Sequence, residues 1–199
     1  MRAAITLAPL APIHRPRIEE IVRASGVFSE EEVEVALELF DETIAGSGER
    51  GAGSGEPNAS GVPALPSPRC PLPDSSYNFL GAFDSAGTLV GYSCHGATPG
   101  TEGTWDLYWI AVHPEAQGSG VGTILMSEVE RRLEGLSARM LVVETSSRSD
   151  YAPTRGFYGR RGYAEAARVR EFYAPGDDRI ILTKRFHSPT VGGEQRHHE

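Results

Sequence analysis

Cysteine is scarce in this sequence: Cys70 and Cys94 are the only two among 199 residues. Cys70 lies in a proline-rich stretch and Cys94 lies in a predicted strand. Two such residues do not make the disulfide framework of a small secreted domain. We therefore expect both thiols to be reduced, which is the default in the cytosol.

The sequence also lacks an excess of basic residues and any long apolar run. It has 19 Lys and Arg residues against 27 Asp and Glu residues, a formal net charge of -8. Nucleic acids and anionic membranes bind to clustered positive charge, so neither is an expected partner. Pro9 and Pro12 interrupt the apolar start, which leaves it too short for a signal peptide or a membrane span. These absences predict a cytoplasmic protein.

One stretch of the chain lacks any hydrophobic period. Residues 46–76 are dominated by Gly, Pro and Ser. Such a segment buries too little apolar surface to offset the entropy of ordering it, so we predict a flexible insert. The insert interrupts a single predicted domain, residues 1–186, and residues 187–199 are predicted to be a disordered tail.

Apolar periodicity predicts a mixed α/β sheet. A short strand at 5–7 precedes two helices, and the second begins with a capping box, Ser29 and Glu32, and ends at Gly46. The helix between Gly120 and Gly135 joins two buried strands, which predicts a right-handed crossover and a parallel pair. The other neighbours are expected to be antiparallel, with helices on both faces of the sheet. The later strands are predicted at 77–83, 89–97, 104–112, 140–145, 163–173 and 179–186, with a further helix at 153–161.

A glycine-rich turn, QGSGVG at 117–122, lies between a buried strand and an amphipathic helix. Glycines let the backbone approach a ligand closely, and N–H groups at a helix N-terminus attract phosphate. Two familiar phosphate-binding motifs are excluded. A nucleotide P-loop needs Lys after its last glycine, where this chain has Thr123. Thr123 also stands where the dinucleotide fingerprint needs its third glycine.

The remaining pattern, Gln117-x-x-Gly120-x-Gly122 after the strand, resembles the GNAT superfamily of N-acetyltransferases. Downstream, LVVET at 141–145 is similar to the fifth strand of that family, and Phe157-Tyr158-x-x-x-Gly162-Tyr163 is similar to its aromatic signature. The resemblance implies about seven mostly antiparallel strands, with a splayed parallel pair at the centre. It covers residues 77–186 well and the insert not at all.

The resemblance implies acetyl-CoA as the acyl donor, bound between the two splayed strands. The pantetheine amides would pair with the strand backbone, and the pyrophosphate would lie on N–H groups of the glycine-rich turn. The cofactor-binding residues implied in this way are Ile110, Ala111, Val112, Gln117, Gly118, Ser119, Gly120, Val121, Gly122 and Thr123.

The resemblance also implies two catalytic residues. Tyr158 matches the general acid of the family, which protonates the departing thiolate, and Phe157 is expected to take the core-facing position beside it. Asp106 stands where many members carry a glutamate base, and strand alternation would place it on one face with Tyr108, Ile110 and Val112. A solvated carboxylate at the strand start is an equally good interpretation of Asp106. Glu144 is an alternative base, or a structural carboxylate.

The predicted activity is direct acetyl transfer from acetyl-CoA to a primary amine of a small molecule. Two alternatives stay open: a protein or peptide acceptor, and an acyl-CoA-binding module without activity. The final hairpin is acidic and aromatic, which suits an ammonium group, although its aspartates favour turns by residue type; the residues are Glu171, Phe172, Tyr173, Asp177 and Asp178. No metal site is expected, because His197 and His198 lack a third ligand. A homodimer would be unsurprising.

Overall fold

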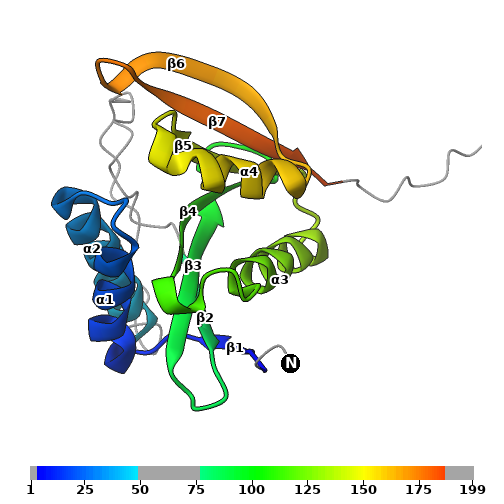
Figure 1. The fold of residues 1–199 in the computed structure, drawn as a ribbon. Helices are drawn as coiled ribbons and strands as arrows, with labels where there is room; N and C mark the ends of the chain where they lie inside the picture. Colours follow the sequence, from blue (N-terminus) through cyan, green and yellow to red (C-terminus); the bar gives the residue numbers. More distant parts are fainter. Residues whose placement is uncertain (1–3, 49–76, 187–199) are drawn as a thin grey trace, which may run out of the picture.

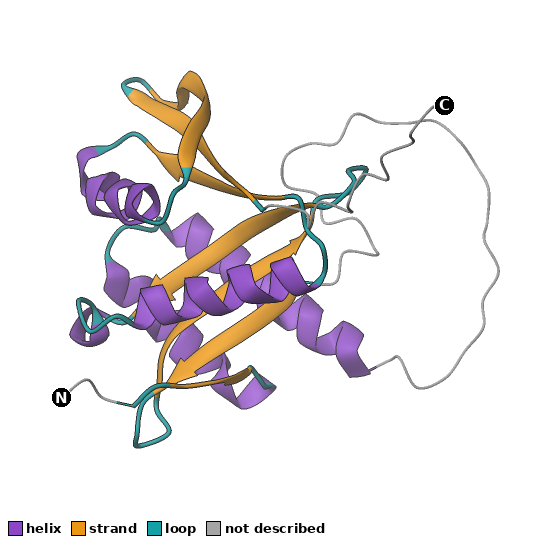
Figure 2. Ribbon diagram, turned by 90° about the vertical axis from the view of Figure 1, so that its right-hand side faces the viewer, coloured by secondary structure: helices purple, strands orange, loops and turns teal. Residues whose placement is uncertain are grey.

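The structure, a computed structural model, describes residues 4–48 and 77–186. Most of the predicted insert and the whole predicted tail lie outside the described residues. The described chain forms one seven-stranded sheet with helices on both faces (Figures 1 and 2). The strands are β1 (Thr6–Pro9), β2 (Asn78–Phe83), β3 (Leu89–Ala97), β4 (Thr104–Val112), β5 (Met140–Ser146), β6 (Ala164–Ala174) and β7 (Asp177–Arg185), and the helices are α1 (Arg15–Ser25), α2 (Glu30–Gly48), α3 (Val121–Gly135) and α4 (Ala152–Arg160).

The sheet has the strand order β1-β2-β3-β4-β5-β7-β6. Every neighbouring pair is antiparallel except β4 and β5, which are parallel and joined through α3. This confirms the mixed sheet and the central parallel pair that the sequence predicts.

Two apolar clusters hold the layers together. Val121, Leu125 and Val129 of α3 pack with Leu141 and other residues on one face of the sheet. On the opposite face, α1 and α2 cover a second cluster, whose fully buried members include Ile18, Phe40 and Tyr92. Both clusters follow from apolar residues at helical spacing and at strand spacing.

Helix α2 begins as predicted but ends later. The Ser29 N–H donates to Glu32 at 2.8 Å and the Glu32 N–H donates to Ser29 Oγ at 3.2 Å, which confirms the capping box. The helix continues to Gly48 rather than ending at Gly46. A single glycine costs a helix only about 1 kcal/mol, so it does not by itself stop one.

Strand β4 carries a bulge that the sequence pattern did not reveal. Cys94 pairs with Trp109 and His95 pairs with Leu107, so Tyr108 has no opposite residue on β3. The extra residue reverses the alternation of side chains along the strand. Ile110 and Val112 therefore face the α3 cluster, as Leu107 does, while Trp109 and Ala111 face the α1–α2 cluster. The prediction that Ile110 and Val112 share a face with Asp106 is wrong.

Candidate active site

The two parallel strands separate halfway along their length. In the described chain, the β4–β5 ladder runs from Thr104 and Met140 to Leu107 and Val143, where it ends. Beyond it, β4 continues to Val112, paired with β3 only, and β5 continues to Ser146, paired with β7 only. On each strand, alternate backbone groups point away from the remaining partner and toward the opening. A ligand with amide groups could pair with them.

The glycine-rich turn lies at the end of the β4 arm of this opening. Gly118 has φ 74° and Gly120, the N-cap of α3, has φ 98°, a region that favours glycine. A Cβ atom on Gly118 would meet nothing within 4 Å, so the space beside the turn is open. Within the described chain, no side chain caps the N-terminus of α3. Its first N–H groups are therefore available to an anion, together with the positive end of the helix dipole.

The side chains of the turn brace it rather than project from it. Gln117 Nε2 donates to the Val112 carbonyl at 3.1 Å, and Ser119 Oγ donates to the Ala116 carbonyl at 2.6 Å. The side chain of Val121 is buried in the core. The N–H groups of Gln117 and Ser119 donate to the carbonyls of Pro114 and Ala116, so these two residues shape the turn. The N–H groups of Gly118 and of the first turn of α3 are the ones that can serve a phosphate.

Tyr158 lies in the core beside the opening. It is 3% exposed, and its ring packs edge-on against Phe157 at 5.3 Å and Tyr163 at 5.4 Å between ring centroids. Phe157 is the less buried of the pair, so the prediction that it takes the core-facing position is wrong. Burial raises the pKa of Tyr158 well above its usual value, which keeps the phenol protonated at neutral pH. A protonated phenol can donate a proton but cannot act as a base.

Asp106 lies half-buried on the opposite face of the sheet, since strand alternation places it away from Leu107. Thr98 Oγ1 donates a hydrogen bond to Asp106 Oδ2 at 2.6 Å. Burial raises the pKa of Asp106, the Thr98 hydrogen bond opposes this shift, and the negative charge of Glu144 adds to it. A carboxylate with a raised pKa is a better proton acceptor than an exposed one.

Glu144 stands on the β5 arm, one residue beyond the last β4–β5 pair. It is ion-paired with Arg179, whose guanidinium lies 4.8 Å from the ring centroid of Phe172. Asp106, on the last paired stretch of β4, and Glu144, on the β5 arm, are close enough for the charge of Glu144 to affect the pKa of Asp106. The contributions of Thr98 and Arg179 could not be found from the sequence, because neither lies in a recognisable motif.

Other candidate groups have structural roles. Burial raises the pKa of the Cys94 thiol well above its usual value, which makes it a poor nucleophile. Asp177 is buried and accepts from Ser146 Oγ at 2.5 Å, and Asp178 accepts from Arg168 and from the Glu171 N–H. Asp178 therefore holds the β6–β7 hairpin, and Asp177 ties the start of β7 to the end of β5.

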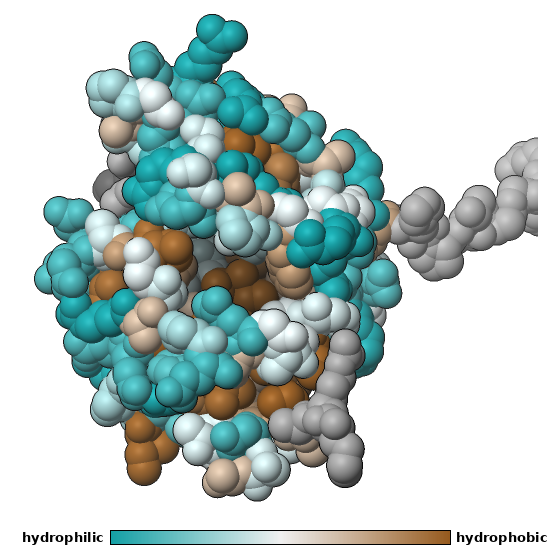
Figure 3. Space-filling view, viewed as in Figure 1, coloured by the Kyte–Doolittle hydropathy of each residue, from teal (hydrophilic) through white to brown (hydrophobic). Residues whose placement is uncertain are grey.

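The surface is hollowed between α3 and α4. Figure 3 shows this hollow near the centre of the face seen in Figure 1, with apolar residues at its floor. Among the described residues, no three His, Cys, Asp or Glu side chains come together in a way that could hold a metal ion. No helix in the same part of the chain is long and apolar enough to cross a membrane.

Comparisons with known proteins agree with this geometry. Residues 57–163 match the Acetyltransferase (GNAT) family. A putative GNAT-family acetyltransferase from Desulfovibrio desulfuricans is 35% identical, with a TM-score of 0.74, and the match covers 92% of this chain and 99% of the other. No curated protein matches the sequence.

Two further solved structures share the fold at low identity. The ribosomal-protein-S18-alanine N-acetyltransferase of Escherichia coli is 17% identical with a TM-score of 0.66, and the match covers 98% of this chain and 100% of the other. A putative acetyltransferase from Salmonella typhimurium, solved with its cofactor acetyl-CoA, is 15% identical with a TM-score of 0.63, covering 94% and 97%.

Proposed function

Because the chain belongs to the GNAT family of acetyltransferases, we propose that it moves an acetyl group from acetyl-CoA directly to a primary amine of a small molecule. The observation that carries the proposal is the opening between β4 and β5. A buried phenol lies on one side of the sheet there and a carboxylate lies on the other. The donor and the acceptor amine can then approach from opposite faces.

The residues of the opening fit acetyl-CoA. Within the turn from Gln117 to Thr123, the N–H groups of Gly118 and of residues 120–123 would hold its pyrophosphate, at an uncapped helix end with open space beside it. From Ile110 to Val112, the backbone groups of β4 that point away from β3 would hold its pantetheine amides. When bound, acetyl-CoA supplies the thioester that is attacked and the thiolate that leaves.

The two catalytic groups divide the proton transfers. Asp106 accepts a proton from the acceptor ammonium, directly or through a water, so that the neutral amine can form the new C–N bond. Tyr158 donates its phenolic proton to the sulfur as the C–S bond breaks, and the extra proton on the newly bonded nitrogen returns to the phenolate through water, which leaves a neutral amide and a neutral phenol. The buried, high-pKa thiol of Cys94 makes a covalent acetyl-cysteine step unfavourable, which supports direct transfer.

A tether on the acceptor side supports a small acceptor. Arg148 and Tyr151 both donate to the Val27 carbonyl, each at 3.2 Å, and join the α1–α2 connection to the segment after β5. Tyr151 and Tyr173 both lie within electrostatic reach of Glu32, which places this tether beside the β6–β7 hairpin. An extended peptide would need a continuous groove across it.

A protein N-terminus is the second candidate acceptor, since the E. coli enzyme that acetylates a ribosomal protein shares the fold. Release of free thiol from acetyl-CoA separates the candidates, measured with panels of small amines and of peptides with free N-termini. We expect turnover with at least one small amine and much slower turnover with peptides. Faster turnover with a peptide would make the acceptor a protein. Acetyl-CoA binding without turnover on either panel would support a module without activity.

A further inference from the structure

Glu130 is a buried carboxylate that joins three elements. It lies on the inner face of α3 and is 8% exposed. Its Oε1 accepts from the Tyr163 hydroxyl at 3.1 Å, and its Oε2 accepts from Arg161 at 3.0 Å and from Lys184 at 2.9 Å. These donors come from the turn after α4 and from β7. One side chain thus ties the helix of the glycine-rich turn to the segment that follows Tyr158.

The stability of the fold does not explain this carboxylate. The other buried residues of α3 are all apolar: Val121, Leu125, Met126, Val129 and Leu133. Removing a charge from water costs several kcal/mol, and replacing a buried ion pair with apolar residues is often neutral or stabilising. A fully paired buried charge fixes the arrangement of its partners, because each hydrogen bond to it has a defined direction and length.

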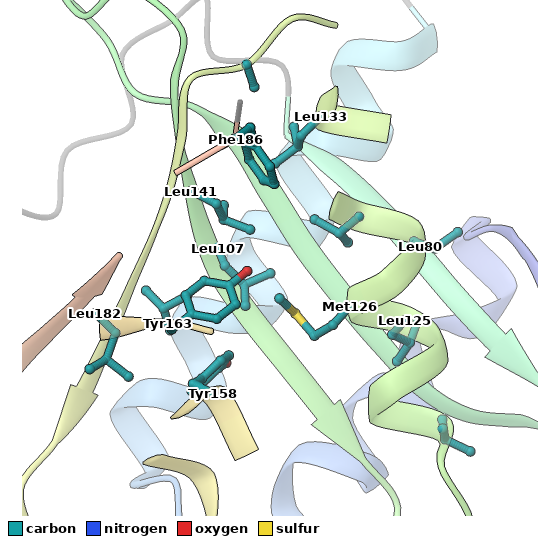
Figure 4. Packing of buried hydrophobic residues seen from close by; sticks show 14 of the residues in the cluster. Leu80, Leu107, Leu125, Met126, Leu133, Leu141, Tyr158, Tyr163, Leu182 and Phe186 are labelled. Atoms are coloured by element: carbon teal, nitrogen blue, oxygen red, sulfur yellow. The ribbon is translucent and has the colours of Figure 1, made fainter. Parts of the chain in front are cut away.

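The partners of Glu130 hold Tyr158 in two ways. The ring of Tyr163 packs edge-on against the ring of Tyr158, with centroids 5.4 Å apart, and Figure 4 shows the two rings next to each other between the sheet and α3. The Tyr158 carbonyl accepts from the N–H groups of Arg161 at 2.9 Å and Tyr163 at 3.1 Å. The Arg161 guanidinium also lies 5.7 Å from the ring centroid of Phe157.

The direction of the Tyr163 hydrogen bond agrees with this arrangement. Burial, and then the carboxylate of Glu130, raise the pKa of Tyr163 well above its usual value. Tyr163 therefore stays protonated, and a hydrogen-bond donor, at neutral pH. The hydrogen bond from the Tyr163 hydroxyl to Glu130 fixes the orientation of the Tyr163 ring. It thereby fixes the edge-on contact between this ring and the ring of Tyr158.

We propose that Glu130 is a positioning residue, which fixes Tyr158 for proton donation through Tyr163 and Arg161. The proposal rests on the proposed function, in which Tyr158 is the proton donor. Glu130 lies on the same helix as the N–H groups that would hold the pyrophosphate. It therefore sets the place of the donor relative to the cofactor. A displacement of about 1 Å at a reacting group can lower a rate by up to about a hundredfold.

A double-mutant cycle tests the proposal. Glu130→Gln keeps the shape of the side chain but removes the charge, and Tyr163→Phe removes only the hydroxyl. Each variant is made in the wild type and in Tyr158→Phe, and kcat is measured with saturating acetyl-CoA and benzylamine as a surrogate acceptor. In the wild type we expect each substitution to lower kcat, by about tenfold for Glu130→Gln. In Tyr158→Phe we expect almost no further loss, because the group being positioned has gone.

Glu128→Gln is the matched control. Glu128 lies on the same helix and also binds two cations, Arg131 and Arg132, but both belong to α3 itself. We expect this substitution to leave kcat unchanged. The affinity for CoA and the melting temperature are measured for every variant, so that a loss of folding is seen directly. If Glu130→Gln does not fold, Tyr163→Phe carries the test, because it leaves Glu130 paired with both cations.

The outcomes separate this inference from the proposed function. An equal loss from Glu130→Gln in the wild type and in Tyr158→Phe would overturn the positioning role while leaving Tyr158 as the donor. Full activity of Tyr158→Phe would overturn both. A loss confined to the chain with an intact Tyr158, together with unchanged CoA affinity, would establish the positioning role, because a general loss of structure would act in both backgrounds.

Discussion

His95 should make the protein lose stability as the pH falls below neutral. It lies on β3, is 3% exposed, and packs near the ring of Trp105 and within electrostatic reach of Arg132 on α3. Its Nδ1 has no hydrogen-bond partner among the described residues. Burial, and secondly the positive charge of Arg132, lower its pKa from 6.5 to about 4.

The sign and size of the effect follow from proton linkage. In the unfolded chain this imidazole takes up a proton near its usual pKa, whereas in the folded protein it stays neutral down to about pH 4. Between these values the unfolded state binds more protons, so the free energy of unfolding falls as the pH falls. At about pH 5 the loss is about 2 kcal/mol, which corresponds to about 4–8 °C in melting temperature for a chain of this size.

Urea unfolding at neutral pH and at about pH 5 checks this value. His95→Leu removes the titration without leaving a polar group unpaired, so we expect it to lose about 2 kcal/mol less than the wild type between the two conditions. Ser93→Ala is the control, since Ser93 is buried on the same strand, also lacks a partner among the described residues, and does not titrate. The reasoning is refuted if His95→Leu keeps the pH dependence of the wild type.

Three further predictions concern the proposed reaction. Gly120→Glu should abolish the thermal protection given by acetyl-CoA, because it places negative charge and bulk at the N-terminus of α3. Gly120→Ala should keep part of this protection. Equal protection in Gly120→Glu and the wild type would exclude this site for the pyrophosphate. Tyr158→Phe should lower turnover about a hundredfold or more with little change in melting temperature or CoA affinity, and an unchanged kcat would exclude it as the proton donor. Asp106→Asn should lower kcat/KM most at low pH, and the loss should shrink as rising pH deprotonates the free amine. If the variant keeps the pH profile of the wild type, Asp106 is not the base and Glu144 is the better candidate.

The strands and helices could be predicted where the spacing of apolar residues within each segment determines its secondary structure. The aromatic and β-branched run of β4 and the apolar spacing of α3 each predict their element, because burial repeats with the period of the backbone. The glycines at 118 and 120 predict the turn, since φ values of 74° and 98° favour glycine. The family resemblance adds the splay of β4 from β5, which no local pattern contains.

The sequence-based predictions were wrong where contacts between residues far apart in the chain decide the structure. The bulge at Tyr108 depends on how β4 pairs with β3, and nothing within β4 marks it. Whether Phe157 or Tyr158 is buried depends on where α4 rests on the sheet, because both residues have aromatic side chains of similar size. The Glu130 contacts join residues 31, 33 and 54 positions apart, and a glutamate on a helix usually indicates a solvent-facing position.

The uncapped start of α3 makes folding and binding interdependent. A side-chain cap typically stabilises a helix by about 1 kcal/mol, and within the described chain α3 has none, because its N-cap residue is Gly120. A phosphate bound there would occupy the place of that missing side chain, so the ligand would complete the first turn of a helix of the domain. Hydrogen exchange at the amides of Val121, Gly122 and Thr123 should therefore slow on binding CoA more than exchange at the far end of the same helix.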